Sequence, residues 1–135
     1  QNENYSELIS HMLAEIILLF ERYSSPAEQT VKSLDYISSY ISEYYNQTID
    51  FNQLAKLSGY SPDHFRHVFS KGKGVSPKQF QINKRLEKSA EFLSGSKKSC
   101  TEIAYLCGFS SSAQFSKMFS DKYGISPNRF RRKNQ

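Results

Sequence analysis

Residues 54–80 read LAKLSGYSPDHFRHVFSKGKGVSPKQF, and residues 103–130 repeat the pattern as IAYLCGFSSSAQFSKMFSDKYGISPNRF. Both copies share an aliphatic-Ala pair, a Gly-aromatic-Ser triplet, two Phe residues four apart, a Gly and a Ser-Pro-x-x-Phe ending. The offset is 49 residues up to the Ser and 50 from the first Phe onward, which indicates one residue inserted between Ser110 and Phe115. Neither copy is long enough to bury a core alone, so the pattern predicts one supersecondary unit duplicated within the chain.

Each copy reads as a short helix, a turn and a second helix. Ala55 and Ala104 place small side chains where the two helices meet, and Gly59 and Gly108 allow the positive φ of a sharp turn. The Phe residues form the buried stripe of the second helix and leave its polar face free. Such a helix-turn-helix fits the major groove of duplex DNA. For one copy alone, an αα-hairpin that packs against a protein is a close alternative; two copies favour DNA.

The rest of the chain extends this pattern into an all-α protein. We expect two helix-turn-helix subdomains joined by a linker helix and preceded by two N-terminal helices. Helices are expected over residues 5–23, 27–45, 51–57, 77–93, 101–106 and 111–121, with further helices from 62 and from 127. Side chains that can cap helices precede several of them: Ser25, Asp50, Ser61, Ser76, Ser110 and Ser126.

Charge is divided unevenly along the chain. Residues 1–49 contain two basic and seven acidic residues, whereas residues 50–135 contain sixteen basic and six acidic ones. The net charge is therefore −5 in the first part and +10 in the duplicated part. A basic field concentrated in one segment is typical of a polyanion-binding surface. An ordinary solvated basic surface is the alternative.

Other classes of protein are disfavoured. No stretch reaches the roughly 18 apolar residues of a membrane span, and the apolar run from Leu8 to Phe20 lacks the basic leader and cleavage site of a signal peptide. Cys100 and Cys107 are expected to be reduced core residues of a cytoplasmic protein.

A catalytic role is a third possibility. Asp63, His64 and His67 share one helix face, but a metal enzyme needs further ligands and a pocket. We therefore expect no catalytic residues, no metal and no cofactor.

The whole pattern resembles the DNA-binding domain of AraC/XylS-type bacterial transcription regulators. The resemblance covers about residues 47–132 and includes both half-motifs and the linker helix between them. It implies two helix-turn-helix subdomains in adjacent major grooves of double-stranded DNA, and activation through contact with RNA polymerase. A linker helix of roughly 25 Å plus two protruding helices can bridge the roughly 34 Å between successive major-groove faces. The expected organisation is a connecting or dimerisation segment over 1–46 and a DNA-binding domain over 47–135, divided into 47–76, 77–95 and 96–135.

By position, the resemblance assigns base reading to the second helix of each copy. Arg66 suits a bidentate contact to guanine, Gln114 suits adenine, and Ala113 suits a thymine methyl group. Asp63 either accepts from cytosine or, as we favour, complements the helix N-terminus. The second reading helix is Ser-rich, which predicts weaker base reading there. The full base-reading set is Asp63, Arg66, His67, Ser112, Ala113, Gln114, Ser116 and Lys117.

Basic and hydroxyl side chains around these helices are candidate phosphate contacts. An ordinary solvated charge is the alternative for about half of the lysines. Arg85, which lies beside Glu87 and Glu91 in the linker, is instead expected to be an ion-paired scaffold residue. The phosphate set is Ser61, Lys71, Lys73, Lys78, Ser110, Lys122, Arg129 and Arg131.

The N-terminal segment has a wide apolar face over residues 8–20. This face can pack on the second helix, form a homodimer seam or join a further domain. The alternative function is accordingly a helical protein-interaction module that acts through the N-terminal helices without sequence-specific DNA reading. Since the chain begins with Gln1, we expect it to be the C-terminal part of a longer regulator whose missing N-terminal domain binds any effector ligand.

Overall fold

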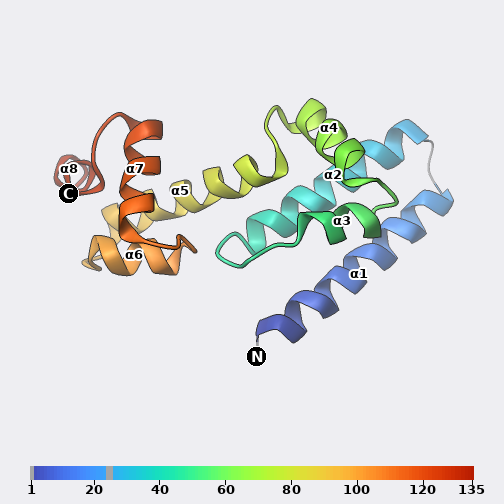
Figure 1. Ribbon diagram of the computed structural model, residues 1–135, viewed down its shortest axis with the longest axis horizontal. Coiled ribbons are helices and arrows are strands. Elements are labelled where there is room, and N and C mark those ends of the chain that lie inside the picture. The colour runs from blue at the N-terminus through green and yellow to red at the C-terminus, as the bar shows by residue number, and fades with distance from the viewer. Residues whose placement is uncertain (1, 24–25) are drawn as a thin grey trace. The chain divides into compact units, whose positions relative to one another are not determined.

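The computed structural model describes residues 2–23 and 26–135, with side chains described over 5–19 and 33–135. Within these ranges it forms eight α-helices and no strand, so the predicted all-α fold is confirmed (Figure 1). The predicted Ser25 cap and the apolar side chain of Phe20 lie outside the described parts. The helices are α1 (Asn2–Tyr23), α2 (Pro26–Glu43), α3 (Phe51–Leu57), α4 (Pro62–Lys73), α5 (Pro77–Gly95), α6 (Cys100–Leu106), α7 (Ser112–Tyr123) and α8 (Pro127–Lys133).

The chain divides into two compact units, each of which contains one copy of the repeat. The first unit combines α1 to α4 with the start of α5, up to Phe80. The second unit combines the segment Tyr44–Thr48 with the rest of α5 and with α6 to α8. The linker helix α5 therefore supplies core residues to both units.

In the first unit, the N-terminal helices complete the core of the first helix-turn-helix. α1 and α2 pack on each other, α1 contacts α3, and α2 contacts α4 (Figure 1). Burying each large apolar side chain stabilises the unit by about 1.5–3 kcal/mol. The buried side chains of these four helices include Leu13, Ile17, Leu34, Ile37, Ile41, Leu54, Phe65 and Phe69.

In the second unit, the core lies between α5, α6 and α7. Leu86 and Leu93 of α5 pack with Ile103 and with the paired rings of α7. Cys107 also belongs to this core, and burial raises the pKa of its thiol to about 11. Cys107 is therefore a neutral thiol at pH 7, and both Cys100 and Cys107 are free.

The two turns of the repeat have the same backbone geometry. The turn glycine has a φ of +80° at Gly59 and +91° at Gly108, in the left-handed region that glycine favours. In both copies the N–H after this glycine donates to the Ala carbonyl of the short helix at 2.9 Å, from Tyr60 to Ala55 and from Phe109 to Ala104. The sequence prediction of two equivalent turns is confirmed.

The aromatic packing of the two copies is equivalent as well. In the first copy the ring of Phe69 meets that of Phe80 edge-on, with 5.6 Å between centroids and 83° between planes. In the second copy Phe119 meets Phe130 at 5.2 Å and 81°. The second Phe of each pair follows a Ser-Pro helix start, so the Ser-Pro-x-x-Phe ending closes each helix-turn-helix with one aromatic contact.

The prediction that Ser110 caps α7 is wrong. α7 begins at Ser112, and Ser111 is its cap, with its side chain accepting from the Gln114 N–H at 3.1 Å. Ser61 caps α4 in the same way, accepting from the His64 N–H at 3.2 Å. Since Ser111 is the structural equivalent of Ser61, the inserted residue of the second copy is Ser110 itself.

Replacing Ser111 with alanine is expected to destabilise the chain by about 1 kcal/mol, because it leaves a helix N-terminal N–H without its capping oxygen. Ser110→Ala is the matched control, since the exposed Ser110 hydroxyl caps nothing and its loss should change stability by less than about 0.5 kcal/mol. Urea unfolding of both variants measures the difference. A larger loss for Ser110→Ala than for Ser111→Ala would contradict this assignment.

The predicted ion pairing of Arg85 is also wrong. Its guanidinium donates to two backbone carbonyls, Tyr45 O at 2.7 Å and Gln47 O at 3.2 Å. The two nearby glutamates pair with lysines instead, Glu87 with Lys84 and Glu91 with Lys88. Arg85 is half-buried, and burial lowers its pKa.

Gln81 anchors the same segment from one turn earlier on α5. Its side chain is 1% exposed and donates to Gln47 O at 2.7 Å and to Tyr45 O at 3.2 Å. The segment that contains Tyr45 and Gln47 is irregular, so the carbonyls of these two residues accept no helical hydrogen bond. Gln81 and Arg85 together donate to both carbonyls. They fix the Tyr44–Thr48 joint against α5 within the second unit.

Candidate nucleic-acid interface

The free face of α4 carries the first set of predicted base-reading residues. Asp63, Arg66 and His67 are all exposed. Asp63 lies in the first turn of α4 and forms an ion pair with Arg66, one turn further along the helix. The Arg66 side chain nevertheless keeps 57% of its surface exposed. The pair therefore presents a guanidinium on the exposed face of α4.

The free face of α7 carries the second set. Ala113, Gln114 and Lys117 are exposed, whereas Ser112 and Ser116 are half-buried. The Gln114 side-chain oxygen accepts from the Ser110 N–H at 3.1 Å and from the Ser110 hydroxyl at 2.7 Å. Gln114 must release both bonds before its amide can contact adenine through oxygen and nitrogen together. The polar side chains of this face are thus mostly short, and its one glutamine is already engaged by Ser110.

The predicted phosphate contacts are not equivalent in the structure. Lys71 and Arg129 are exposed, and Lys78 is exposed at the start of α5. Lys73 pairs with Asp35 of α2 at 3.0 Å, and the Lys122 ammonium lies 5.6 Å from the Tyr123 ring centroid. Ser61 and Ser110 are exposed and engaged in the local hydrogen bonds described above.

Arg131 has a structural position that the sequence did not indicate. It is half-buried, its Nε donates to Leu93 O at 3.2 Å, and its terminal nitrogen donates to Lys98 O. These bonds tie α8 to the end of α5 and to the loop that follows it. Arg131 therefore has fewer donors left for a phosphate than Arg129, which is exposed two residues earlier.

Within each unit, the structure brings its own reading helix and its own cations together. In the first unit Arg66, Lys71 and Lys73 lie on α4, and Lys78 follows on α5. In the second unit Lys117 and Lys122 lie on α7, and Arg129 lies on α8. Each helix-turn-helix thus combines an exposed polar helix with flanking positive charge, which is what docking into a groove between two phosphate backbones requires.

Among the residues that the structure describes, no helix is long and apolar enough to cross a membrane. No cluster of three or more His, Cys, Asp and Glu side chains that could hold a metal ion occurs in the described part of the chain.

Comparison with known proteins agrees with this geometry. A protein family described as "Helix-turn-helix domain" matches residues 54–133. The probable transcriptional regulator LumQ of Photobacterium leiognathi is 27% identical over 131 residues, which are 96% of this chain and 50% of LumQ. The probable transcription factor PqrA of Proteus vulgaris is 33% identical over 86 residues, which are 64% of this chain and 70% of PqrA. The chain spans about half the length of LumQ.

A solved structure has the same fold. The DNA-binding domain of AdpA, described as a global transcriptional factor and crystallised in complex with a target DNA, superimposes with a TM-score of 0.69. It is 27% identical in sequence, and the match covers 74% of this chain and 90% of that domain.

Proposed function

Because this chain belongs to the AraC/XylS family of helix-turn-helix DNA-binding domains, we propose that it binds specific sequences of double-stranded DNA and thereby regulates transcription. One observation carries the proposal: the chain holds two complete helix-turn-helix motifs, and each leaves a polar helix exposed beside basic side chains. The two helices α4 and α7 would enter adjacent major grooves, so one chain would do the work of a helix-turn-helix dimer.

Arg66 is the residue that we propose as the main base reader. Its guanidinium is exposed and carries two parallel donors for guanine O6 and N7. Asp63 pairs with it and restricts its orientation, which lowers the entropy lost when the arginine meets a base. We propose that Asp63, His67 and the α7 residues Ser112, Ala113, Gln114, Ser116 and Lys117 complete the reading surface, with α7 the weaker contributor.

Replacing Arg66 with alanine is expected to weaken binding to the preferred duplex by about 1–3 kcal/mol, or roughly 5- to 150-fold, and to abolish the preference for guanine at one position. Fluorescence anisotropy with the preferred duplex and with duplexes that carry each other base at that position measures both effects. Lys71→Gln is the matched control, since it should weaken all of these duplexes equally. If Arg66→Ala weakened the affinity for all of these duplexes equally, Arg66 would not read a base.

The wider role follows from the family. We propose that the chain acts at promoters as an activator through contact with RNA polymerase, and that it does so in the cytoplasm. We propose further that residues 1–46 connect the DNA-binding domain over 47–135 to an N-terminal domain that binds any effector ligand. We propose no catalytic residue, metal or cofactor.

The second candidate function is protein association through α1. Four large apolar side chains of α1 are 54–67% exposed, and they follow one another at spacings of three, four and seven residues: Tyr5, Leu8, Met12 and Leu19. This is the a/d spacing of a coiled-coil seam, interrupted once at Glu15, and it fits a second copy of the same helix. Leu18 and Ile16, at 61% and 41% exposure, widen the apolar surface.

We expect sedimentation equilibrium to show a concentration-dependent dimer, and Leu8→Ser combined with Met12→Ser to weaken it at least tenfold. Both side chains are already exposed, so the double variant should keep the melting temperature of the monomer. A monomer mass at the highest accessible concentration would contradict this role for α1.

A further inference from the structure

Four cations of the second unit belong to none of the sites described above. Lys97 and Lys98 lie in the loop between α5 and α6, and Arg132 and Lys133 lie in the last turn of α8. All four side chains are exposed. Among the side chains that the structure describes, no carboxylate forms an ion pair with any of them. We call these four residues the C-terminal basic patch.

Two side chains at the end of the chain bring the halves of this patch together. Arg131 donates to Lys98 O and, at 3.2 Å, to Leu93 O. The side-chain amide of Gln135 also donates to Leu93 O, at 3.4 Å. These bonds fasten the end of α8 to the end of α5 and to the loop that follows α5. The two halves of the patch therefore lie next to each other, although the whole second helix-turn-helix separates them in sequence.

The patch continues a row of cations that begins on α8 with Arg129. Arg129, Arg132 and Lys133 are spaced at i, i+3 and i+4, which places them on one side of the helix. The opposite side carries the buried Pro127 and the half-buried Phe130, which pack into the second unit. The exposed side of α8 is therefore positively charged over its whole length.

The chain around the patch contains no acidic residue. Residues 92–101 and 122–135 together hold seven basic residues and no Asp or Glu. Of the carboxylates that flank the first stretch, Glu91 already forms an ion pair, and Glu102 accepts a hydrogen bond at the start of α6. This end of the second unit therefore has a surplus of positive charge that suits a polyanion.

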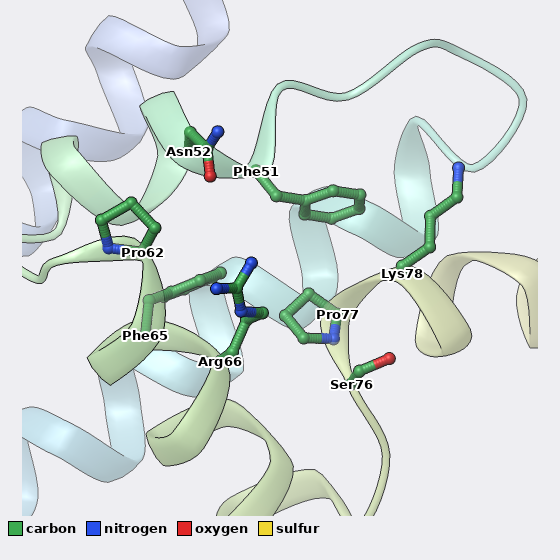
Figure 2. Close-up of a pocket in the computed structure, with 8 residues that line it drawn as sticks. All are labelled: Phe51, Asn52, Pro62, Phe65, Arg66, Ser76, Pro77 and Lys78. Atoms are coloured by element: carbon green, nitrogen blue, oxygen red, sulfur yellow. The ribbon is translucent and has the colours of Figure 1, made fainter.

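The first copy of the repeat shows that the fold does not require this charge. Figure 2 shows Ser76, Pro77 and Lys78 at the start of α5, across a pocket from Phe65 and Arg66 of α4. The second copy has the uncharged Asn128 in place of Lys78, and its cations follow later on the helix. Since both copies have the same turn and the same aromatic closure, the charges of the patch serve binding rather than folding. The positions of the first copy that match the patch are all uncharged: Thr48, Ile49, Ile82 and Asn83.

The patch lies at the end of α5 that is remote from the first helix-turn-helix. From Pro77 to Leu93, α5 rises by roughly 24 Å. The second reading helix α7 contacts α8, which carries half of the patch. A duplex that α4 and α7 read in adjacent grooves would continue past α7 on this side.

We propose that the C-terminal basic patch binds backbone phosphates of the duplex outside the base pairs that α7 reads. This inference rests on the proposed function, because it requires a duplex that is already held by α4 and α7. A phosphate backbone suits exposed lysines and arginines, since it offers closely spaced negative charge whatever the sequence. Such contacts would supply affinity to a unit whose reading helix has mostly short polar side chains and an engaged Gln114.

Three duplexes test the proposal by fluorescence anisotropy at 50 to 200 mM salt. The short duplex ends at the outer edges of the two selected sites, and the other two carry about 10 bp more, one helical turn, beyond the α7 site or beyond the α4 site. On the short duplex we expect a slope of log K against log salt near −4.5, from the five cations assigned to the two motifs. The extension beyond the α7 site should make the slope steeper by about 2–4, because each neutralised phosphate adds about 0.9. The extension beyond the α4 site is the control and should add little, because residues 1–49 of the first unit have a net charge of −5.

A variant with all four patch residues changed to Gln isolates the patch. On the duplex extended beyond the α7 site, its slope should return to that of the short duplex. Its melting temperature should be kept, because all four side chains are exposed. Lys97→Arg, Lys98→Arg, Arg132→Lys and Lys133→Arg combined keep the charge and should keep the steeper slope.

The outcomes separate this inference from the proposed function. Equal slopes of the wild-type chain on all three duplexes would overturn the inference, leave the proposed function intact and make an acidic protein surface the partner of the patch. A loss by the Gln variant that is equal on the short and the extended duplexes would also overturn it, because only the net charge would then matter. A chain that binds none of the duplexes would overturn the proposed function itself.

Discussion

Gly108→Ala is expected to destabilise the chain by about 3–5 kcal/mol, a large part of the roughly 5–15 kcal/mol that holds a domain folded. A Cβ at this position would lie close to the backbone of Asn46: 2.8 Å from the carbonyl oxygen of Asn46, 2.9 Å from the Cα of Asn46 and 3.0 Å from the carbonyl carbon of Asn46. All three atoms are backbone, so no side chain can turn away to make room. The φ of +91° adds the strain of a left-handed alanine.

The duplication provides a matched control. Gly59 occupies the same turn in the first copy with a φ of +80°, and a Cβ there would meet nothing within 4 Å. Gly59→Ala should therefore show the conformational cost alone, about 1–2 kcal/mol. Urea unfolding of both variants gives the comparison. Equal losses would mean that the contact between Gly108 and Asn46 does not constrain the second unit.

Raising the salt concentration from 50 to 200 mM is expected to weaken DNA binding roughly 500-fold, through release of counterions from about five neutralised phosphates. The five cations that we assign to phosphates are Lys71, Lys73, Lys78, Lys122 and Arg129. Arg131 is left out because its donors are engaged by Leu93 O and Lys98 O. Anisotropy titrations across this range give the slope of log K against log salt, which should be near −4.5.

Single variants test which cations contribute to that slope. Lys71→Gln should reduce its magnitude by about 1, because Lys71 is exposed on the reading helix α4. Lys88→Gln is the control, since Lys88 lies on the linker helix α5 and is not among the five cations assigned to phosphates, and it should leave the slope unchanged. A slope near zero in the wild-type chain would contradict a phosphate-binding surface altogether.

Much of the fold follows from short-range patterns in the sequence. The turn glycines, the caps Asp50, Ser61 and Ser126, and the Phe stripes all act within one or two helical turns. Their physical effect is local, so residue type and spacing are enough to predict them. The structure adds that the N-terminal helices pack on the first helix-turn-helix, which is a tertiary contact.

The wrong predictions have a common physical cause. Ser110 and Ser111 are chemically equal as caps, and only the path of the chain after Gly108 decides between them. Arg85 has acidic neighbours in sequence, but its partners are carbonyls 38 and 40 residues away. Long polar side chains choose among partners that the fold brings near them, and a sequence shows only the local ones.

The candidate site, too, could be predicted from the sequence only where local patterns determine it. The exposed face of α4 could be predicted because burial of Phe65 and Phe69 fixes which side of the helix is free. The pairing of Gln114 with Ser110 could not, because it depends on the path of the chain before α7.

We propose that both helix-turn-helix motifs engage one DNA duplex. Selection of bound duplexes from a randomised pool, carried out at two salt concentrations, tests it most directly. We predict two selected boxes about 10–10.5 bp apart from centre to centre, the stronger one matching α4, and weaker recovery at the higher salt concentration. A pool that shows no enrichment, with binding that does not change with salt, would contradict the account and shift the function to a protein partner of the N-terminal helices.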